Sequence, residues 1–482
     1  MLEISKLLFS SWNENHLNYC HWKSNEHLLL GLNGDTDLDV LLSESDKAKG
    51  EEILNQLNFL QCKSQYGSRY PGVDDWIGYD QGTGKFIHVH LHYHVITGHK
   101  GLKEYNLPWT SKMLEKRIQD KATGVFISDP NVEIVTLYTR MALKVSISDI
   151  YLKLLGKYHI DKSILVEIDY LKKRIVWERV EQMVSEYYNR YASQVIGIMR
   201  KNIFNSQDVF ALRRIAEKVF RKDSRNKYSN RILEFYYKYA LKFRKFLRLK
   251  MNQFIITRKV PRTEKGLQIA FLGQDGAGKT TVTKLIRKWW SWKMDVQLVY
   301  LGSGENYHSW RKMLLSILPN TIGFKTLRAW LTLSKYTQLS KDVLHAIQKG
   351  KKYARKGGLV IYDRYPQIQY AGLSDGPKIR TVFLEKAPSV FKVLFERFAK
   401  TEEKYLKKAA GHQPDIVFKL VIPPDESVRR KPENALETME IKHNIIKSLQ
   451  YENSDVYIID ATMPFEEEVL KIKRIIWEHV QK

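Results

Sequence analysis

The order of apolar and polar positions divides the chain into helical and strand-like stretches. Residues 2–17, Pro130–Lys144 and Asp161–Tyr187 repeat apolar residues every three to four positions, which predicts amphipathic helices. Short apolar runs bounded by turn-forming residues predict buried strands at Leu267–Leu272, Val296–Leu301 and Leu359–Tyr362. Strands that alternate with helices in this way predict an α/β fold.

These patterns predict three segments. Residues 1–105 mix both periodicities and form an N-terminal α/β domain, whereas residues 106–257 turn helical and basic. The stretch Arg258–Gly266 has the composition of a linker. Behind it, residues 267–482 predict a second α/β domain with a parallel sheet.

A glycine-rich turn follows the strand at Leu267–Leu272. The sequence Phe271-Leu-Gly-Gln-Asp-Gly-Ala-Gly-Lys-Thr-Thr281 contains the pattern G-x-x-x-x-G-K-[ST], and helical spacing resumes behind it. Glycines let backbone N–H groups wrap around a phosphate, and the next helix directs the positive end of its dipole at the same anion. We expect Lys279 to face solvent as a mobile cation for the phosphates, and the Thr280 hydroxyl to ligate Mg²⁺.

A second pair of candidate residues follows another predicted strand. Asp363 and Arg364 come directly after Leu359–Tyr362, at the carboxyl end where ligands bind in open α/β sheets. An aspartate there can hold Mg²⁺ through water, and an arginine can fork onto an incoming phosphate. The pair therefore predicts a site for phosphoryl transfer close to Lys279.

Together these stretches resemble the thymidylate kinase family, from Leu267 to Lys482. The glycine-rich turn matches that family's version, including its Asp-Gly and doubled threonine, and Ile361–Tyr365 matches its Asp-Arg-aromatic motif. The resemblance implies an ATP-dependent kinase in which Asp363 assists the metal and Arg364 contacts the acceptor phosphate. It also implies an ATP and Mg²⁺ site made of Gly273, Asp275, Gly276, Ala277, Gly278, Lys279, Thr280 and Thr281, with Asp275 placed for a sugar hydroxyl of the acceptor.

The same resemblance extends to a lid. Ser427–Lys431 is similar to the start of the family's lid helix, which implies that Arg429 and Arg430 close over the transferred phosphoryl group. The family has an Arg-Glu-Pro-Gly-Gly segment after its second strand, where this chain has Leu301–Asn306. Phosphoryl transfer is therefore better supported than thymidylate as the acceptor. A nucleoside monophosphate, another nucleotide and a sugar on a glycan all remain open.

The N-terminal domain carries a different pattern of candidate residues. Asp37 and Asp39 alternate with apolar residues, so on a strand their carboxylates share one face and could hold a divalent metal ion. Ser24 lies upstream of them. This arrangement resembles the nucleotidyltransferase fold, in which a Gly-Ser turn precedes an Asp-x-Asp strand, although Lys23 stands where glycine is expected.

The strand expected to supply that fold's third carboxylate carries histidines instead. Lys85–Ile96 contains His88, His90, His92 and His94 on one face and no acid, with His90 at the position of the carboxylate. Imidazole binds Mg²⁺ poorly, but two of these histidines could bind a transition metal. We therefore expect this module to be inactive in nucleotidyl transfer or to work with a softer metal, and an active nucleotidyltransferase is the alternative.

Charge adds a further expectation about partners. The net charge is +26, which predicts a nucleotide, an anionic polymer or a membrane surface as partner. The segment Lys201–Lys250 has fifteen Lys and Arg residues against four Asp and Glu residues. Its end, Tyr236–Lys250, interleaves aromatics with cations and could lie on such a surface or pack as an amphipathic helix.

Two function classes follow from these observations. The first is a thymidylate kinase-like enzyme acting on a nucleotide or on a sugar of polysaccharide biosynthesis. The second is an ATP-binding regulatory protein with the basic segment as its effector surface. Two cysteines, Cys20 and Cys62, and the lack of a bilayer-length apolar run favour a cytoplasmic protein. The oligomeric state does not follow from the sequence.

Overall fold

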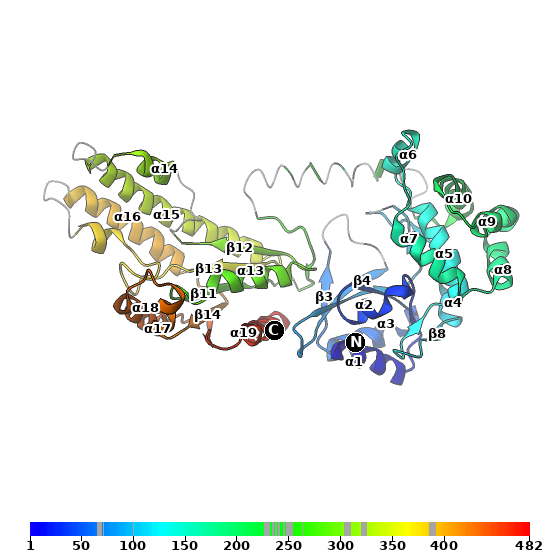
Figure 1. The fold of residues 1–482 in the computed structure, drawn as a ribbon, viewed down its shortest axis with the longest axis horizontal. Helices are drawn as coiled ribbons and strands as arrows, with labels where there is room; N and C mark the ends of the chain where they lie inside the picture. Colours follow the sequence, from blue (N-terminus) through cyan, green and yellow to red (C-terminus); the bar gives the residue numbers. More distant parts are fainter. Residues whose placement is uncertain are drawn as a thin grey trace. The chain divides into compact units, whose positions relative to one another are not determined.

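The computed structural model divides into two compact units, Met1–Met251 and Asn252–Lys482. Figure 1 shows the first in blue to green and the second in green to red. The structure describes residues 1–64, 70, 72–99, 101–225, a few positions between 232 and 246, 254–263, 265–302, 310–319, 325–384 and 392–482. All but a few positions of the basic stretch Tyr236–Lys250 therefore lie outside the described residues.

The first unit combines a mixed sheet with a group of helices. Its helices are α1 (Glu3–Glu14), α2 (Leu28–Leu32), α3 (Lys47–Gln56), α4 (Thr110–Glu115), α5 (Pro130–Leu143), α6 (Ile147–Leu154), α7 (Lys162–Lys172), α8 (Trp177–Tyr188), α9 (Ala192–Met199) and α10 (Ser206–Val219). Its strands are β1 (Tyr19–His21), β2 (Asp37–Leu42), β3 (Leu60–Lys63), β4 (Val73–Tyr79), β5 (Phe86–His92), β6 (Ile96–Thr97), β7 (Tyr105–Asn106), β8 (Ile118–Gln119) and β9 (Phe126–Ile127).

The register of the sheet places polar residues of three strands side by side. Strands of this unit run in the order β3-β4-β5-β2-β1-β9-β8. β2 and β5 are parallel with Asp39 opposite His90, and β4 is antiparallel to β5 with Asp75 opposite His90. Alternate residues such as Val40 and Val89 point to the other face, where they pack in one core with apolar residues of α1 and α3.

The helical part of this unit shares its core with the sheet. Trp22 and Leu41 belong to one buried cluster with residues of α5, α8 and α10. The division at residue 105 stays a prediction. In the structure, Met1–Met251 form one compact unit, and the parts before and after residue 105 bury apolar side chains against each other. The helix expected over Asp161–Tyr187 is divided into α7 and α8, with extended backbone at Val176.

The second unit is built on a parallel sheet, as predicted. Its helices are α13 (Lys279–Trp290), α14 (Trp310–Ile317), α15 (Lys325–Ala354), α16 (Lys392–Ala410), α17 (Pro424–Arg430), α18 (Leu436–Ser448) and α19 (Phe465–Gln481). Its strands are β10 (Val260–Pro261), β11 (Gln268–Gly273), β12 (Val296–Tyr300), β13 (Leu359–Asp363), β14 (Ile416–Val421) and β15 (Asp455–Asp460).

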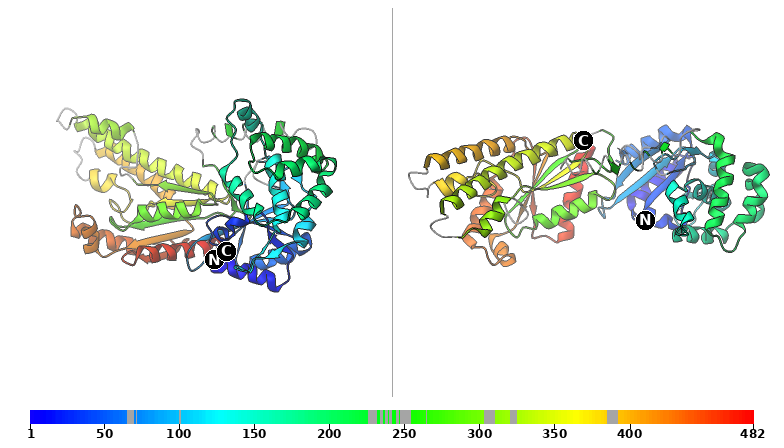
Figure 2. Two further views of the ribbon diagram at one scale, coloured as in Figure 1. Left: turned by 45° about the vertical axis from the view of Figure 1, so that its right-hand side comes forward. Right: turned by 90° about the horizontal axis from the view of Figure 1, so that it is seen from above.

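Five of these strands form one layer, covered by helices. They run in the order β12-β13-β11-β14-β15 and every neighbouring pair is parallel. Ala270 and Leu272 of the central strand β11 pack in one core with residues of α15 and α18. Figures 1 and 2 show α15 and α16 running side by side, and the two helices are in contact. The segment that follows β11 therefore starts in the middle of the sheet, between the ends of β13 and β14.

Cys20 and Cys62 are both buried, and they form no disulfide bond. In the part of the chain that the structure describes, no helix combines the length and the apolar character needed to cross a bilayer.

Candidate functional site

The glycine-rich turn joins β11 to α13 in the predicted order of strand, loop and helix. Gly276 and Gly278 have φ values of 85° and 80°, in the left-handed region that glycine adopts without strain. Gly278 is the residue at the N-terminus of α13, so the first N–H groups of this helix face the loop. Ala277 is buried inside the turn, and Thr281 is exposed in the first turn of the helix. The backbone therefore has the geometry of an anion site.

Lys279 is buried, which contradicts the expectation that it faces solvent. Its side chain folds back into the turn, and Nζ donates hydrogen bonds to the carbonyl oxygens of Gly273 at 2.8 Å and Gln274 at 2.9 Å. Burial, followed by the nearby Arg364 guanidinium, lowers the pKa of Lys279 to about 8. The loop thus encloses the Lys279 ammonium group, which now contacts two carbonyl oxygens and would also contact a bound phosphate.

Thr280 and Asp363 meet beside the loop. Thr280 Oγ1 donates a hydrogen bond to Asp363 Oδ2 at 2.8 Å. Oδ1 of Asp363 is buried and has no hydrogen-bond partner among the described residues. Hard divalent cations take hydroxyl, carboxylate and water oxygens as ligands, so these two side chains fit a hydrated Mg²⁺ ion.

Arg364 extends from the end of β13 into the same region. Its φ is 74°, an uncommon value for a residue with a side chain, and its N–H donates to the Phe271 carbonyl at 3.1 Å. Its guanidinium lies between Asp275 at 3.7 Å and Asp375 at 3.6 Å. Burial disfavours the charge, but Asp375 and the other anionic neighbours together outweigh burial, and the pKa of Arg364 is raised.

The carboxylate of Asp275 forms ion pairs with cationic side chains. Its Oδ2 accepts a hydrogen bond from Lys442 Nζ of α18 at 2.6 Å. Burial opposes ionisation, but this bond and the neighbouring charges of Lys442 and Lys279 lower the pKa of Asp275. The role of Asp275 toward a sugar hydroxyl stays a prediction, and any such hydroxyl would share the carboxylate with Lys442.

Lys279, Arg364 and Asp275 line one cavity of about 250 Å³. It has an excess of cations over carboxylates, which favours an anionic ligand. The charged residues of its wall are Lys279, Arg364, Lys378, Lys442, Asp275 and Asp375. The structure thus brings Lys279 and Arg364 to one space, as the sequence analysis expected.

Asp375, Lys378 and Lys442 were missed by the sequence analysis. Asp375 lies in a turn held by Gln367, whose Nε2 donates to the carbonyl oxygens of Tyr370 and Leu373, each at 2.8 Å. Lys378 follows this turn, and its N–H donates to Glu402 Oε2 at 3.1 Å. The turn-forming composition of Ser374–Lys378 was a signal for a loop near Asp363-Arg364, but not for its contact with Arg364. Lys442 comes from a helix distant in sequence, and no local pattern marks it.

Arg429 and Arg430 lie at the C-terminal end of the short helix α17 rather than at the start of a lid helix. The helix ends at Arg430 because Pro432 disfavours helical backbone at the residue before it. Both arginines pair with Glu426, at 2.6 and 2.7 Å, and Arg430 also donates to the Gly276 carbonyl at 3.3 Å. Neither belongs to the described residues that line the cavity. Their action on a transferred phosphoryl group stays a prediction.

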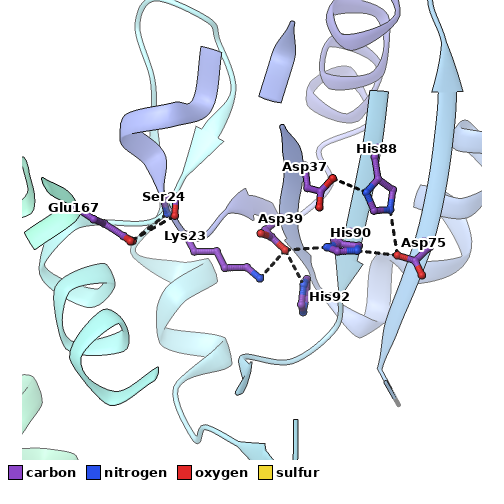
Figure 3. Close-up of polar contacts among 9 residues, drawn as sticks. All are labelled: Lys23, Ser24, Asp37, Asp39, Asp75, His88, His90, His92 and Glu167. Atoms are coloured by element: carbon purple, nitrogen blue, oxygen red, sulfur yellow. Dashed lines mark hydrogen bonds and ion pairs between the residues drawn. The ribbon is translucent and has the colours of Figure 1, made fainter. Parts of the chain in front are cut away.

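In the first unit, Asp37 and Asp39 share one face of β2 as predicted, beside the histidines of β5 (Figure 3). Asp39 Oδ1 lies 2.6 Å from Lys23 Nζ, 3.3 Å from His90 Nδ1 and 3.2 Å from His92 Nε2. Although burial opposes ionisation, Lys23 and the two imidazoles hold the pKa of Asp39 well below its usual range. Lys23, which stands where the resemblance expects glycine, thus contacts the carboxylate directly.

A third carboxylate is present in this cluster, so the expectation that it is missing was wrong. Asp75 Oδ1 lies 2.9 Å from His90 Nε2 and 3.2 Å from His88 Nε2. The acid comes from β4, whereas the third carboxylate was expected on the strand that became β5. Nearby, Ser24 has a φ of 56° and its N–H donates to Glu167 Oε1 at 3.2 Å (Figure 3).

Comparisons with known proteins give distant similarities. No family model matches the chain. The chain is 25% identical over 214 residues to the uncharacterised ATP-binding protein YghR of Escherichia coli K12, which covers 41% of this chain and 82% of that protein. It is 24% identical over 213 residues to the uncharacterised ATP-binding protein YghS of the same strain, covering 41% and 87%.

A search of solved structures found deoxyadenosine kinase from M. mycoides with bound dATP, at 16% identity and a TM-score of 0.27. The match covers 44% of this chain and 99% of that one. At this TM-score the likeness adds nothing to the fold that the sheet order itself defines.

Proposed function

We propose that the second unit transfers the γ-phosphoryl group of ATP to a phosphorylated acceptor bound in the cavity beside Lys279. The observation that carries this proposal is the cavity itself, in which the lysine of the phosphate loop and Arg364 face one space. The description of the relatives YghR and YghS as ATP-binding proteins supports ATP as the donor.

The residues divide between the two substrates. The turn from Gly273 to Thr280 would hold the ATP phosphates through backbone N–H groups and Lys279. Thr280 and Asp363 would hold Mg²⁺, which offsets the charge of the β- and γ-phosphates. Arg364 would bind the acceptor phosphate on the opposite side of the cavity. Variants of the loop should therefore weaken the binding of ATP, whereas variants of Arg364 should weaken the binding of the acceptor.

The reaction itself needs little from the protein besides positioning and charge. An acceptor oxygen forms a bond to the γ-phosphorus, the bond from that phosphorus to the β–γ bridging oxygen breaks, and ADP leaves. The two positive groups Lys279 and Arg364 stabilise the charge on the oxygens of the group in transit. The aspartates Asp275 and Asp375 keep Arg364 oriented.

The acceptor is a nucleoside monophosphate or a related phosphorylated compound, as the thymidylate kinase resemblance suggests. A cavity with lysines 378 and 442 beside Arg364 suits a ligand with at least one phosphate. A sugar phosphate of polysaccharide synthesis fits the same charges. An ATP switch without an acceptor would not need these three cations facing Lys279, so we favour the kinase.

The test is an acceptor screen. The full chain is incubated with ATP, Mg²⁺ and either nucleoside monophosphates or sugar phosphates, and products are identified by mass spectrometry. We expect one class to gain a phosphoryl group. ATP binding without any phosphorylated product across both panels would instead favour the regulatory function.

A further inference from the structure

The cluster of carboxylates and imidazoles in the first unit has no part in the phosphate site. It lies on one face of the sheet, where β2, β5 and β4 bring Asp37, Asp39, Asp75 and three histidines together (Figure 3). His88 and His92 are fully buried, and the partly covered His90 lies between them. Burying so many ligand-type groups is costly unless they are paired or bind a cation.

Two sets of three residues in this cluster have donor atoms close enough to hold one ion. Asp37, His88 and His90 form the first, and Asp39, His90 and His92 form the second, each with its donor atoms within 4.8 Å of one another. Donors around a metal ion bound at about 2.0–2.2 Å lie roughly 3–3.5 Å apart. The first set therefore needs only a small adjustment to close around an ion.

The position of Lys23 favours the first set over the second as the metal site. Its ammonium contacts Asp39 at 2.6 Å, so this carboxylate already has a cation. A divalent ion bound to Asp39 would lie beside that ammonium, and like charges at this separation repel. Figure 3 shows Lys23 directed at Asp39, whereas Asp37 is directed at His88. Asp37 Oδ1 and His88 Nδ1 are 2.7 Å apart.

The outer contacts of the histidines also fit the first set. Each ring of His88 and His90 has a carboxylate on both nitrogens, with Asp75 Oδ1 at 3.2 and 2.9 Å from their Nε2 atoms. Metal-binding histidines commonly place the second ring nitrogen on a carboxylate, which orients the imidazole and raises its basicity. Asp75 is in position to do this for His88 through Nε2, and Asp39 for His90 through Nδ1.

We propose that Asp37, His88 and His90 bind a divalent transition-metal ion, with Asp75 and Asp39 orienting the two imidazoles. Two nitrogen ligands and one carboxylate favour ions such as Zn²⁺, Co²⁺, Mn²⁺ or Fe²⁺ over Mg²⁺ and Ca²⁺, which prefer oxygen. The site belongs to the first unit and does not depend on the function proposed for the second. Asp37 is half-buried, which leaves room for water or a substrate oxygen as a further ligand.

The test uses Co²⁺ with the full-length chain, without an affinity tag, after treatment with a chelator. Binding is followed by the visible absorption of the bound ion and by elemental analysis after gel filtration, with Mg²⁺ in excess to occupy the phosphate site. We expect one Co²⁺ per chain that Zn²⁺ displaces and Mg²⁺ does not.

Variants locate the ion. His88 is fully buried, so its replacement puts the fold at risk, and Asp37→Asn and His90→Gln are the better changes. Each should weaken Co²⁺ binding by about 10-fold or more and alter the absorption spectrum. The matched control is His94→Gln, because His94 lies outside the cluster and pairs with Glu44 at 3.5 Å.

Far-ultraviolet circular dichroism first establishes that each variant is folded, so that a loss of Co²⁺ binding is distinguished from a loss of the fold. Co²⁺ retained in His94→Gln but lost in Asp37→Asn and His90→Gln supports the site. Equal retention in all variants, no retention by the unmodified chain, or displacement by Mg²⁺ as readily as by Zn²⁺ would each overturn the proposal.

Discussion

Thr280 and Asp363, 83 positions apart in the sequence, are joined by a 2.8 Å hydrogen bond. The bond connects the first turn of α13 to the end of β13, and the second oxygen of Asp363 is left buried without a partner among the described residues. A metal ion ligated by the Thr280 hydroxyl would therefore lie next to a carboxylate that the fold holds in place.

The first prediction concerns this carboxylate. Asp363→Asn removes a negative charge that would hold the hydrated ion, so the Mg²⁺ concentration for half-maximal activity should rise by about 10-fold or more. Activity is measured against Mg²⁺ at saturating ATP. Thr280→Ser keeps the hydroxyl and should change this concentration little. An unchanged Mg²⁺ dependence in Asp363→Asn would contradict the assigned role.

The second prediction is a pH dependence of ATP binding. The pKa of Lys279 in the ligand-free protein is lowered to about 8 by burial and by Arg364, and a bound phosphate raises it again. Below about pH 8, Lys279 is protonated both in the ligand-free protein and in the ATP complex. Above about pH 8, only the Lys279 of the complex keeps its proton. The affinity for ATP should therefore fall as the pH rises above about 8.

Titration calorimetry between pH 7.5 and 9.5 measures this effect. In Lys279→Met the affinity should be weak throughout and should lose the decline above pH 8. A decline of the same size in the variant would show that another group causes it.

The third prediction separates acceptor from donor. Arg364→Ala leaves the acceptor phosphate without its bidentate partner, which should cost roughly 2–5 kcal/mol of acceptor binding. The KM for ATP should change far less. Arg364→Lys keeps the charge but cannot form two parallel hydrogen bonds to the phosphate. Its loss of acceptor binding should lie between zero and the loss in Arg364→Ala. Equal losses for both substrates would remove Arg364 from the acceptor site.

The fourth prediction concerns the backbone of the phosphate loop. Gly278 has a φ of 80° and open space around an added Cβ, so Gly278→Ala introduces only backbone strain. We expect a loss of about 1–2 kcal/mol in the free energy of unfolding. Gly411→Ala is the control, because Gly411 has no left-handed φ and meets only ordinary contacts. Equal stabilities of the two variants would contradict the backbone strain expected in Gly278→Ala.

Local patterns predicted most of the second unit. The apolar runs at Leu267–Leu272 and Leu359–Tyr362 became β11 and β13, and the order of strand, glycine-rich turn and helix was correct. These features depend on residues close in sequence, whose periodicity reflects the local conformation. The contacts of Lys442 and Asp375 were not predicted, because they form only when distant segments pack together.

Contacts between distant segments also explain why the predictions for the first unit were incomplete. The register of β2 and β5 places Asp39 opposite His90, and Asp75 reaches the cluster from β4, a strand that the sequence did not indicate. Adjacent Asp74 and Asp75 point to opposite faces, and only the pairing of β4 with β5 decides which one meets the histidines. Lys279 was expected in solvent because a loop pattern does not show how the turn closes around its own side chain.

The measurement that tests the central claim most directly is the fate of the γ-phosphoryl group. ATP labelled with oxygen-18 in that group is incubated with the full chain, Mg²⁺ and the acceptor panels, and the label is followed by mass spectrometry. We predict that it moves intact to a phosphorylated acceptor, and that Lys279→Ala abolishes this transfer while the protein stays folded. Label found only in ATP and inorganic phosphate for every acceptor, or unchanged transfer by Lys279→Ala, would contradict the account.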